Sequence, residues 1–131
     1  MQGPATSTAG ALEDALAYFN RALRLSPADP SAFITLTGIA HVQMIRGHYA
    51  EAVAFAEQSL AVADFDCAYW MLIAANAQLG GMADARNWLA KFRALAPGIT
   101  IARIKAGQAD KDGTRMAAIL EGLRLAGLDE G

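Results

Sequence analysis

The residues that could perform catalysis or bind a metal are few and widely spaced in this sequence. His41 and His48 are seven positions apart, and neither has a cysteine or a carboxylate at the spacing of a second metal ligand. Cys67 is the only cysteine, so neither an internal disulfide nor a thiolate zinc site can form. The spacing also supports no Ser-His-Asp or Cys-His arrangement. We therefore expect no catalytic site, no metal and no cofactor.

Two short motifs share only part of the pattern of a ligand-binding loop. The stretch 110–113, Asp-Lys-Asp-Gly, opens like a calcium-binding loop, but its glycine comes early and no glutamate follows at the required distance. Gly80 and Gly81 adjoin no phosphate-binding pattern. We interpret both as turns between helices.

The composition predicts a folded, soluble chain. Of 131 residues, 54% are hydrophobic and 18% are charged, which is enough apolar surface to offset the entropy lost on ordering. Charged residues interrupt every apolar stretch, so we expect no membrane-spanning segment. Residues 1–9 are small and polar, without the features of a secretory signal, and we expect a frayed tail or a fragment boundary there. The single cysteine fits a reducing, cytoplasmic compartment.

The net charge of −2 hides an asymmetry along the chain. Residues 1–85 carry three basic and eight acidic side chains, whereas residues 86–131 carry eight basic and five acidic ones. A cluster of basic residues can bind a phosphate backbone, but spread over two helices it more often forms a solvated face. Nucleic acid therefore remains a minor alternative partner, through Arg86, Lys91, Arg93, Arg103 and Lys105.

Helical periodicity dominates the sequence and predicts an all-α fold. The connections between the expected helices are short and contain glycine or proline, so neighbouring helices should form antiparallel hairpins. Asp29 and Pro30 are expected to start the second helix, with the proline in its first turn. The expected helices cover residues 10–25, 30–46, 49–63, 66–79, 82–95, 99–106 and 114–126.

An internal repeat is the most informative feature of the chain. The same spacing of four positions occurs three times. It begins with a small residue, followed four positions later by a large or small residue and three further on by a small or apolar one. A residue that ends the helix comes five positions after that. The small positions 15, 52 and 85 are 37 and 33 residues apart. The repeats read Ala15, Phe19, Ala22, Pro27; then Ala52, Ala56, Ser59, Asp64; then Ala85, Leu89, Phe92, Pro97.

This pattern resembles the tetratricopeptide repeat, a helix-turn-helix unit of about 34 residues. Trp70, Ile73 and Ala74 occupy slots of its first helix, and the turn 46–52 matches its Gly-x-Tyr-x-Glu-Ala motif. The resemblance implies stacked antiparallel helix hairpins forming an alpha-alpha superhelix with a C-terminal capping helix. We expect one domain over 10–131, divided into a half repeat (10–27), two repeats (30–64 and 66–97) and a degenerate cap (99–128).

Three further stretches resemble one particular subfamily of these repeats. Residues 24–30, 37–41 and 120–128 together look like one bacterial subfamily, in which such repeats form the C-terminal segment of class III adenylate or guanylate cyclase proteins and sometimes of winged-helix transcription regulators. The similarity covers residues 11–130. It implies a larger parent protein with an upstream catalytic or DNA-binding domain that this chain does not contain.

The family's architecture implies a binding groove on the inner face of the first helices. A protein or peptide partner would use apolar anchors there. The carboxylate clamp of chaperone-binding repeats needs Lys and Asn at these positions, and they are absent, so a chaperone-tail adaptor is disfavoured. The predicted groove residues are Thr37, His41, Met44, Met71, Ala75 and Gln78.

The first helix, 10–25, has the pattern of a second helix of a hairpin whose first helix is missing. We expect a homodimer to cover its apolar stripe, since exposed stripes of this kind mark interaction sites. The stripe consists of Leu12, Leu16, Phe19 and Leu23, with Ala15 and Ala22 as a small-residue seam. A purely structural oligomerisation domain and an RNA-associated repeat are the alternatives to a protein-binding module.

Overall fold

The computed structural model describes residues 9–26, 29–107 and 116–131. The described part contains seven helices and no strand, which confirms the all-α fold. The expected tail lies outside these residues apart from Ala9, and so does the stretch 110–113. The helices are α2 (Ala9–Leu25), α3 (Ala32–Arg46), α4 (Tyr49–Val62), α5 (Asp66–Gln78), α6 (Met82–Leu95), α7 (Ile101–Ala106) and α8 (Ala117–Ala126).

Local chemistry explains where most of these helices stop and start. Gly47 ends α3 in the left-handed conformation, at φ 79°, and its N–H bonds to carbonyls of the last turn. Thr100 is the N-cap residue of α7, and its side-chain oxygen accepts from the amide of Arg103 at 3.2 Å. The start of α3 differs from the expectation. Pro30 lies in the preceding turn, because Asp29 Oδ1 accepts from the amide of Ser31 at 2.8 Å and holds a local turn there.

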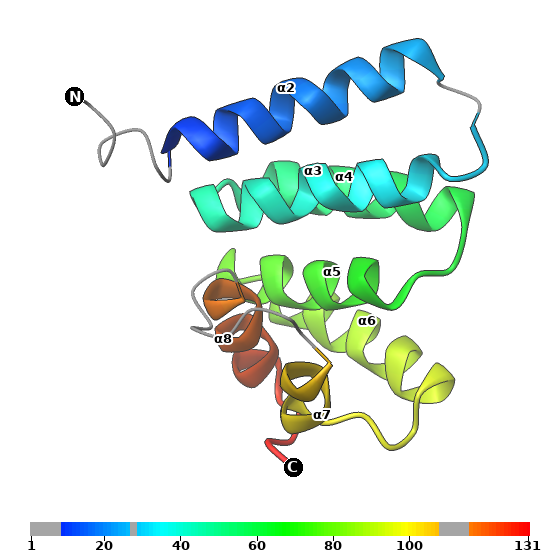
Figure 1. Cartoon of the computed structure of the whole chain (residues 1–131). Coiled ribbons are helices and arrows are strands. Elements are labelled where there is room, and N and C mark those ends of the chain that lie inside the picture. Colours follow the sequence, from blue (N-terminus) through cyan, green and yellow to red (C-terminus); the bar gives the residue numbers. More distant parts are fainter. Residues whose placement is uncertain (1–8, 27–28, 108–115) are drawn as a thin grey trace.

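Helices α2 to α6 stack in sequence order (Figure 1). The hairpins α3 with α4 and α5 with α6 fall within the two expected repeat ranges, and α4 packs against α5 to join them. At one end α2 packs against α3. At the other end α8 packs mainly against α5, with smaller contacts to α6, α3 and α7.

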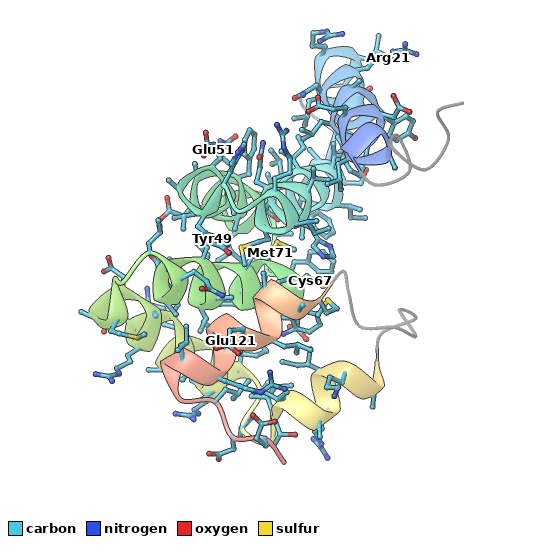
Figure 2. All side chains as sticks on the ribbon, turned by 90° about the vertical axis from the view of Figure 1, so that its left-hand side faces the viewer. Arg21, Tyr49, Glu51, Cys67, Met71 and Glu121 are labelled. Atoms are coloured by element: carbon cyan, nitrogen blue, oxygen red, sulfur yellow. The ribbon has the colours of Figure 1, made fainter. Side chains whose placement is uncertain are left out.

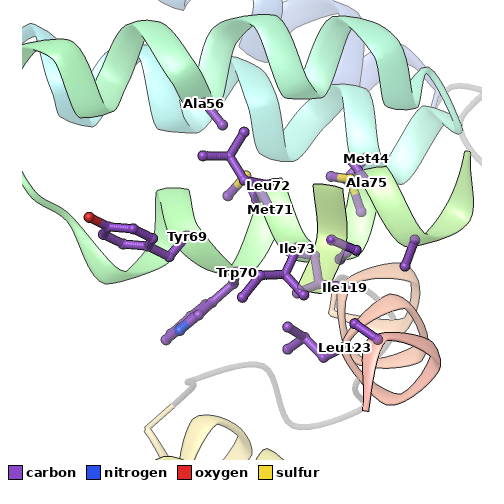
Figure 3. Packing of buried hydrophobic residues seen from close by; sticks show 14 of the residues in the cluster. Met44, Ala56, Tyr69, Trp70, Met71, Leu72, Ile73, Ala75, Ile119 and Leu123 are labelled. Carbon is purple, nitrogen blue, oxygen red and sulfur yellow. The ribbon is translucent and has the colours of Figure 1, made fainter. Parts of the chain in front are cut away.

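Helix α5 lies at the centre of this stack. Every residue from Ala68 to Ala75 is buried, and so is Ala77, because α3, α4, α6 and α8 all contact the helix. A helix that is apolar around its whole circumference is typical of such a central position. Figure 3 shows the two sides of α5: Met71, Leu72 and Ala75 lie toward Met44 and Ala56, and Trp70 and Ile73 lie toward Ile119 and Leu123.

The contact between α5 and α8 depends on a glycine. A Cβ atom at Gly122 would lie 2.5 Å from both the Cα and the carbonyl oxygen of Ala74. Such distances do not occur between real atoms, so the two backbones approach as closely as they do only because Gly122 has no side chain. Further along the crossing, Gln78 Nε2 donates to the carbonyl of Ala118 at 3.2 Å.

The last residues of the chain fasten α7 to this end of the stack. The amide of Ile101 donates to the carbonyl of Asp129 at 2.8 Å, and the amide of Ala102 donates to that of Glu130 at 2.8 Å. These bonds satisfy amides in the first turn of α7 that have no partner within the helix. The short helix is thus held by the residues that follow α8.

We expect Gly122→Ala to lower the free energy of unfolding by about 1–3 kcal/mol, because overpacking against a backbone that cannot yield has a cost of that size. The higher helix propensity of alanine would recover about 1 kcal/mol at most. Urea unfolding followed by circular dichroism measures the difference. Gly107→Ala is the matched control, since its Cβ would meet only ordinary contacts at 3.7 Å. Equal stability of the two variants would contradict the close contact.

Candidate functional site

The predicted groove residues lie mostly in the core. Thr37 is 5% exposed, Met44 1%, Met71 2% and Ala75 0%. Figure 2 shows Met71 inside the stack. The expectation that these four residues line an open groove is therefore wrong, while His41 and Gln78 are half-buried.

The packing of α5 explains this burial. Met71 and Ala75 lie on the side of α5 that meets the preceding hairpin, next to Met44 (Figure 3). Gln78 donates to the backbone of α8, so the chain's own last helix covers that end of α5. In an extended array the inner face of each first helix would stay open, but here the capping helix packs along the central helix.

Thr37 is buried for a separate reason, because it belongs to a polar cluster between α3 and α4. Its hydroxyl donates to the carbonyl of Phe33 at 2.7 Å. Ser59 Oγ lies 2.7 Å from Thr37 Oγ1 and 3.0 Å from the same carbonyl, so its proton has an acceptor in either direction. Buried hydroxyls need such partners. The cluster joins the two helices of one hairpin, and Thr37 is engaged within the fold.

The predicted self-association stripe faces α3. Leu12, Leu16, Phe19 and Leu23 are all half-buried. The ring of Phe19 lies so close to Gly38 that a Cβ there would be 2.7 Å from its Cζ. The helical spacing places the three leucines on the same side. The large apolar residues that α2 exposes are instead Tyr18, at 69%, and Leu25, at 75%.

A shallow hollow of about 380 Å³ lies between α4, α5 and α6. Trp88 forms one wall, with its ring edge-on to Tyr69 at 6.0 Å and the ammonium of Lys91 4.6 Å from its centroid. Carboxylates, amides and one valine complete the lining, so the hollow offers an aromatic face beside charges of both signs. Its residues are Val53, Glu57, Asn76, Asp84, Asn87, Trp88 and Lys91.

The sequence did not reveal this hollow. Trp88 and Lys91 are three positions apart and share a helix face, which is a detectable signal. Glu57 and Asn76 come from two other helices, and only the packing of α4 and α6 against α5 brings them to the same place.

The five basic residues considered for nucleic acid are all exposed, on α6 and α7. Two of them make contacts within the chain. Lys91 lies over Trp88, and Arg93 Nη2 donates to the carbonyl of Gly127 at 3.0 Å.

The titratable groups of the described residues form no group of three that could hold a metal ion. His48 Nδ1 lies 3.1 Å from Gln43 Oε1, in the turn after α3. Burial, together with the nearby Asp66 carboxylate, raises the pKa of the Cys67 thiol to about 11. Among the residues that the structure describes, no helix combines the length and apolar character needed to cross a bilayer.

We expect Met71→Ala to lower the free energy of unfolding by about 2–5 kcal/mol, as other buried methionine truncations do. Gln78→Ala should cost about 0.5–1.5 kcal/mol, because it removes one partly exposed hydrogen bond. Chemical denaturation of both variants measures the two losses. A Met71 variant as stable as the wild type would show that this side chain lies on an open surface after all.

We expect Cys67 to react slowly with iodoacetamide in the native protein. A thiol pKa of about 11 in place of 9.0 leaves roughly a hundredfold less thiolate at pH 8, and the thiolate is the nucleophile. The native rate should keep rising with pH until about pH 11. The same thiol in urea is the internal control, and equal native and unfolded rates at pH 8 would contradict the raised pKa.

Comparison with known families agrees with this architecture. A sequence profile of the tetratricopeptide repeat matches residues 8–76, which is more than half of the chain. No curated protein and no solved structure matches the chain. The match spans α2, the hairpin of α3 and α4, and most of α5, where small residues such as Ala40, Ala52 and Ala74 are fully buried at the helix contacts. The chain therefore belongs to the tetratricopeptide repeat family.

Proposed function

We propose that this chain is a non-catalytic protein-interaction module and the C-terminal regulatory or assembly part of a bacterial, cytoplasmic adenylate or guanylate cyclase-like signalling protein. The observation that carries the proposal is membership of the tetratricopeptide repeat family, whose repeats generally mediate contacts between proteins. The cyclase context rests on the resemblance of residues 24–30, 37–41 and 120–128.

The hollow between α4 and α6 is the surface that best suits a protein partner. Tryptophan is enriched among the residues that dominate binding energies, and Trp88 is half-buried and held in place by Tyr69. Around it, Glu57, Asp84 and Lys91 can pair with charges of a partner, and Asn87 offers an amide. An extended peptide segment fits such a mixture better than a purely apolar ligand, because its backbone needs polar partners.

We expect the chain to bind a class III cyclase catalytic domain encoded in the same genome, added in trans. Glu57→Lys should weaken this binding about tenfold or more, because it reverses a charge at the edge of the hollow and truncation or reversal of interface charges has effects of that size. Isothermal titration calorimetry measures the affinity.

The matched control for that experiment is Glu121→Lys, which reverses an exposed charge on α8 outside the hollow. Cyclase domains that neither bind the chain nor change their rate or assembly in its presence would refute the cyclase context. If Glu57→Lys and Glu121→Lys change the affinity for the cyclase domain by the same amount, the partner binds to another face.

A further inference from the structure

Helix α2 leaves uncovered a face that is covered in both complete hairpins. Repeat positions 52, 55 and 59 of α4 and 85, 88 and 92 of α6 correspond to 15, 18 and 22 of α2. In α4 and α6 these positions contact the first helix of the same hairpin, as the bond of Ser59 to α3 and the ring contact of Trp88 with Tyr69 show. Trp88 is half-buried, whereas Tyr18 at the corresponding position is 69% exposed. Ala52, Ala85 and Ser59 are 0% exposed, whereas their counterparts Ala15 and Ala22 are only half-buried. The hairpin face of α2 therefore has no neighbour among the described helices other than α3.

The uncovered face is a regular stripe. Its residues follow one another at alternating steps of four and three, the spacing of a seam between two packed helices. At 100° per residue the stripe lies roughly a third of a turn from the side that carries Phe19 and meets α3. It keeps the small-residue seam of Ala15 and Ala22 that the sequence suggested, but it does not contain the four residues of the leucine stripe. Its members are Ala11, Ala15, Tyr18, Ala22 and Leu25.

Two opposite charges lie beside this stripe. Asp14 and Arg21 are both exposed, seven positions apart, and flank the stripe on the side away from α3. Figure 2 shows Arg21 on α2, at the outer end of the molecule. Along the helix, Asp14 and Arg21 lie at nearly equal distances from Tyr18, Asp14 before it and Arg21 after it. Glu13 takes no part, since it pairs with Arg46 of α3 at 3.3 Å.

We propose that a second copy of this chain covers this face, with α2 packed antiparallel against α2 of the partner around a two-fold axis close to Tyr18. In this arrangement Asp14 pairs with Arg21 of the partner subunit, and each pair occurs twice by symmetry. Ala15 lies opposite Ala22 of the partner subunit, and these small side chains let the helices approach closely. A parallel pair would place Asp14 and Arg21 beside the apolar side of the other helix, without complementary charge.

This inference rests on the proposed role as an interaction module and names one partner, the chain itself. Sedimentation velocity over micromolar concentrations is the first test, and the wild type should associate to a dimer. Asp14→Arg and Arg21→Asp should each weaken self-association about tenfold or more, because both create like-charge pairs across the two-fold axis. An equimolar mixture of the two variants should form a heterodimer, and the double variant D14R/R21D should dimerise again.

A cross-link tests the geometry separately. On a Cys67→Ser background, Tyr18→Cys should oxidise to a disulfide-linked dimer, whereas Asn20→Cys, on the opposite side of α2, should not. Glu121→Arg on α8 is the charge control and should leave the dimer unchanged.

A wild-type chain that stays monomeric would leave this face to a different helix and would overturn the inference. Charge variants without effect, a mixture that fails to associate, or equal cross-linking at positions 18 and 20 would do the same. Binding of the cyclase domain is measured separately through Glu57→Lys. A monomer that still binds that domain refutes only the dimer, and a dimer that binds no cyclase domain refutes only the cyclase context.

Discussion

The close approach of α8 to α5 is the contact on which the rest of the structure depends. Gly122 lies directly against the backbone of Ala74, at a distance that no side chain permits. This approach seats α8 along α5, which is then buried on all sides by four helices. Small residues also lie at the helix crossings within the repeats. Four of them are 0% exposed there: Ala40, Ala52, Ala74 and Ala85. Small residues set the distances between helices, and the larger apolar residues fill the space that those distances leave.

Burial of α5 decides where this protein can meet others. A tetratricopeptide array that is long and open can bind a partner along the inner faces of its first helices. In this chain those faces are either packed between hairpins, as at Met71, or covered by α8, as at Gln78. Two surfaces that remain open in the described part of the chain are the hollow between α4 and α6 and the outer face of α2. The first combines Trp88 with charges of both signs, and the second presents Tyr18 and Leu25 between flanking charges.

The two surfaces differ in the interactions that would govern them. Apart from Trp88 and Val53 the hollow is polar, so binding there is expected to depend largely on hydrogen bonds and charge pairs and to be specific and sensitive to salt. The α2 face is mainly apolar, and its charges serve to select orientation more than to add affinity. Because the two lie on different helices, a dimer formed through α2 would leave the hollow accessible on each subunit.

The sequence by itself determined the helices, the repeat and the family, because these depend on local periodicity and on spacing along the chain. The spacing along the chain identified Ala52, Ala56 and Ser59 as positions of the repeat, and all three are buried. What the tertiary structure alone decided is which neighbour each helix face meets. Periodicity shows that Met71 and Phe19 lie on apolar sides, but only the stack places Met71 inside the core and Phe19 against Gly38. The hollow beside Trp88 and the seat of α8 at Gly122 arise from residues distant in sequence, and no local pattern contains such contacts.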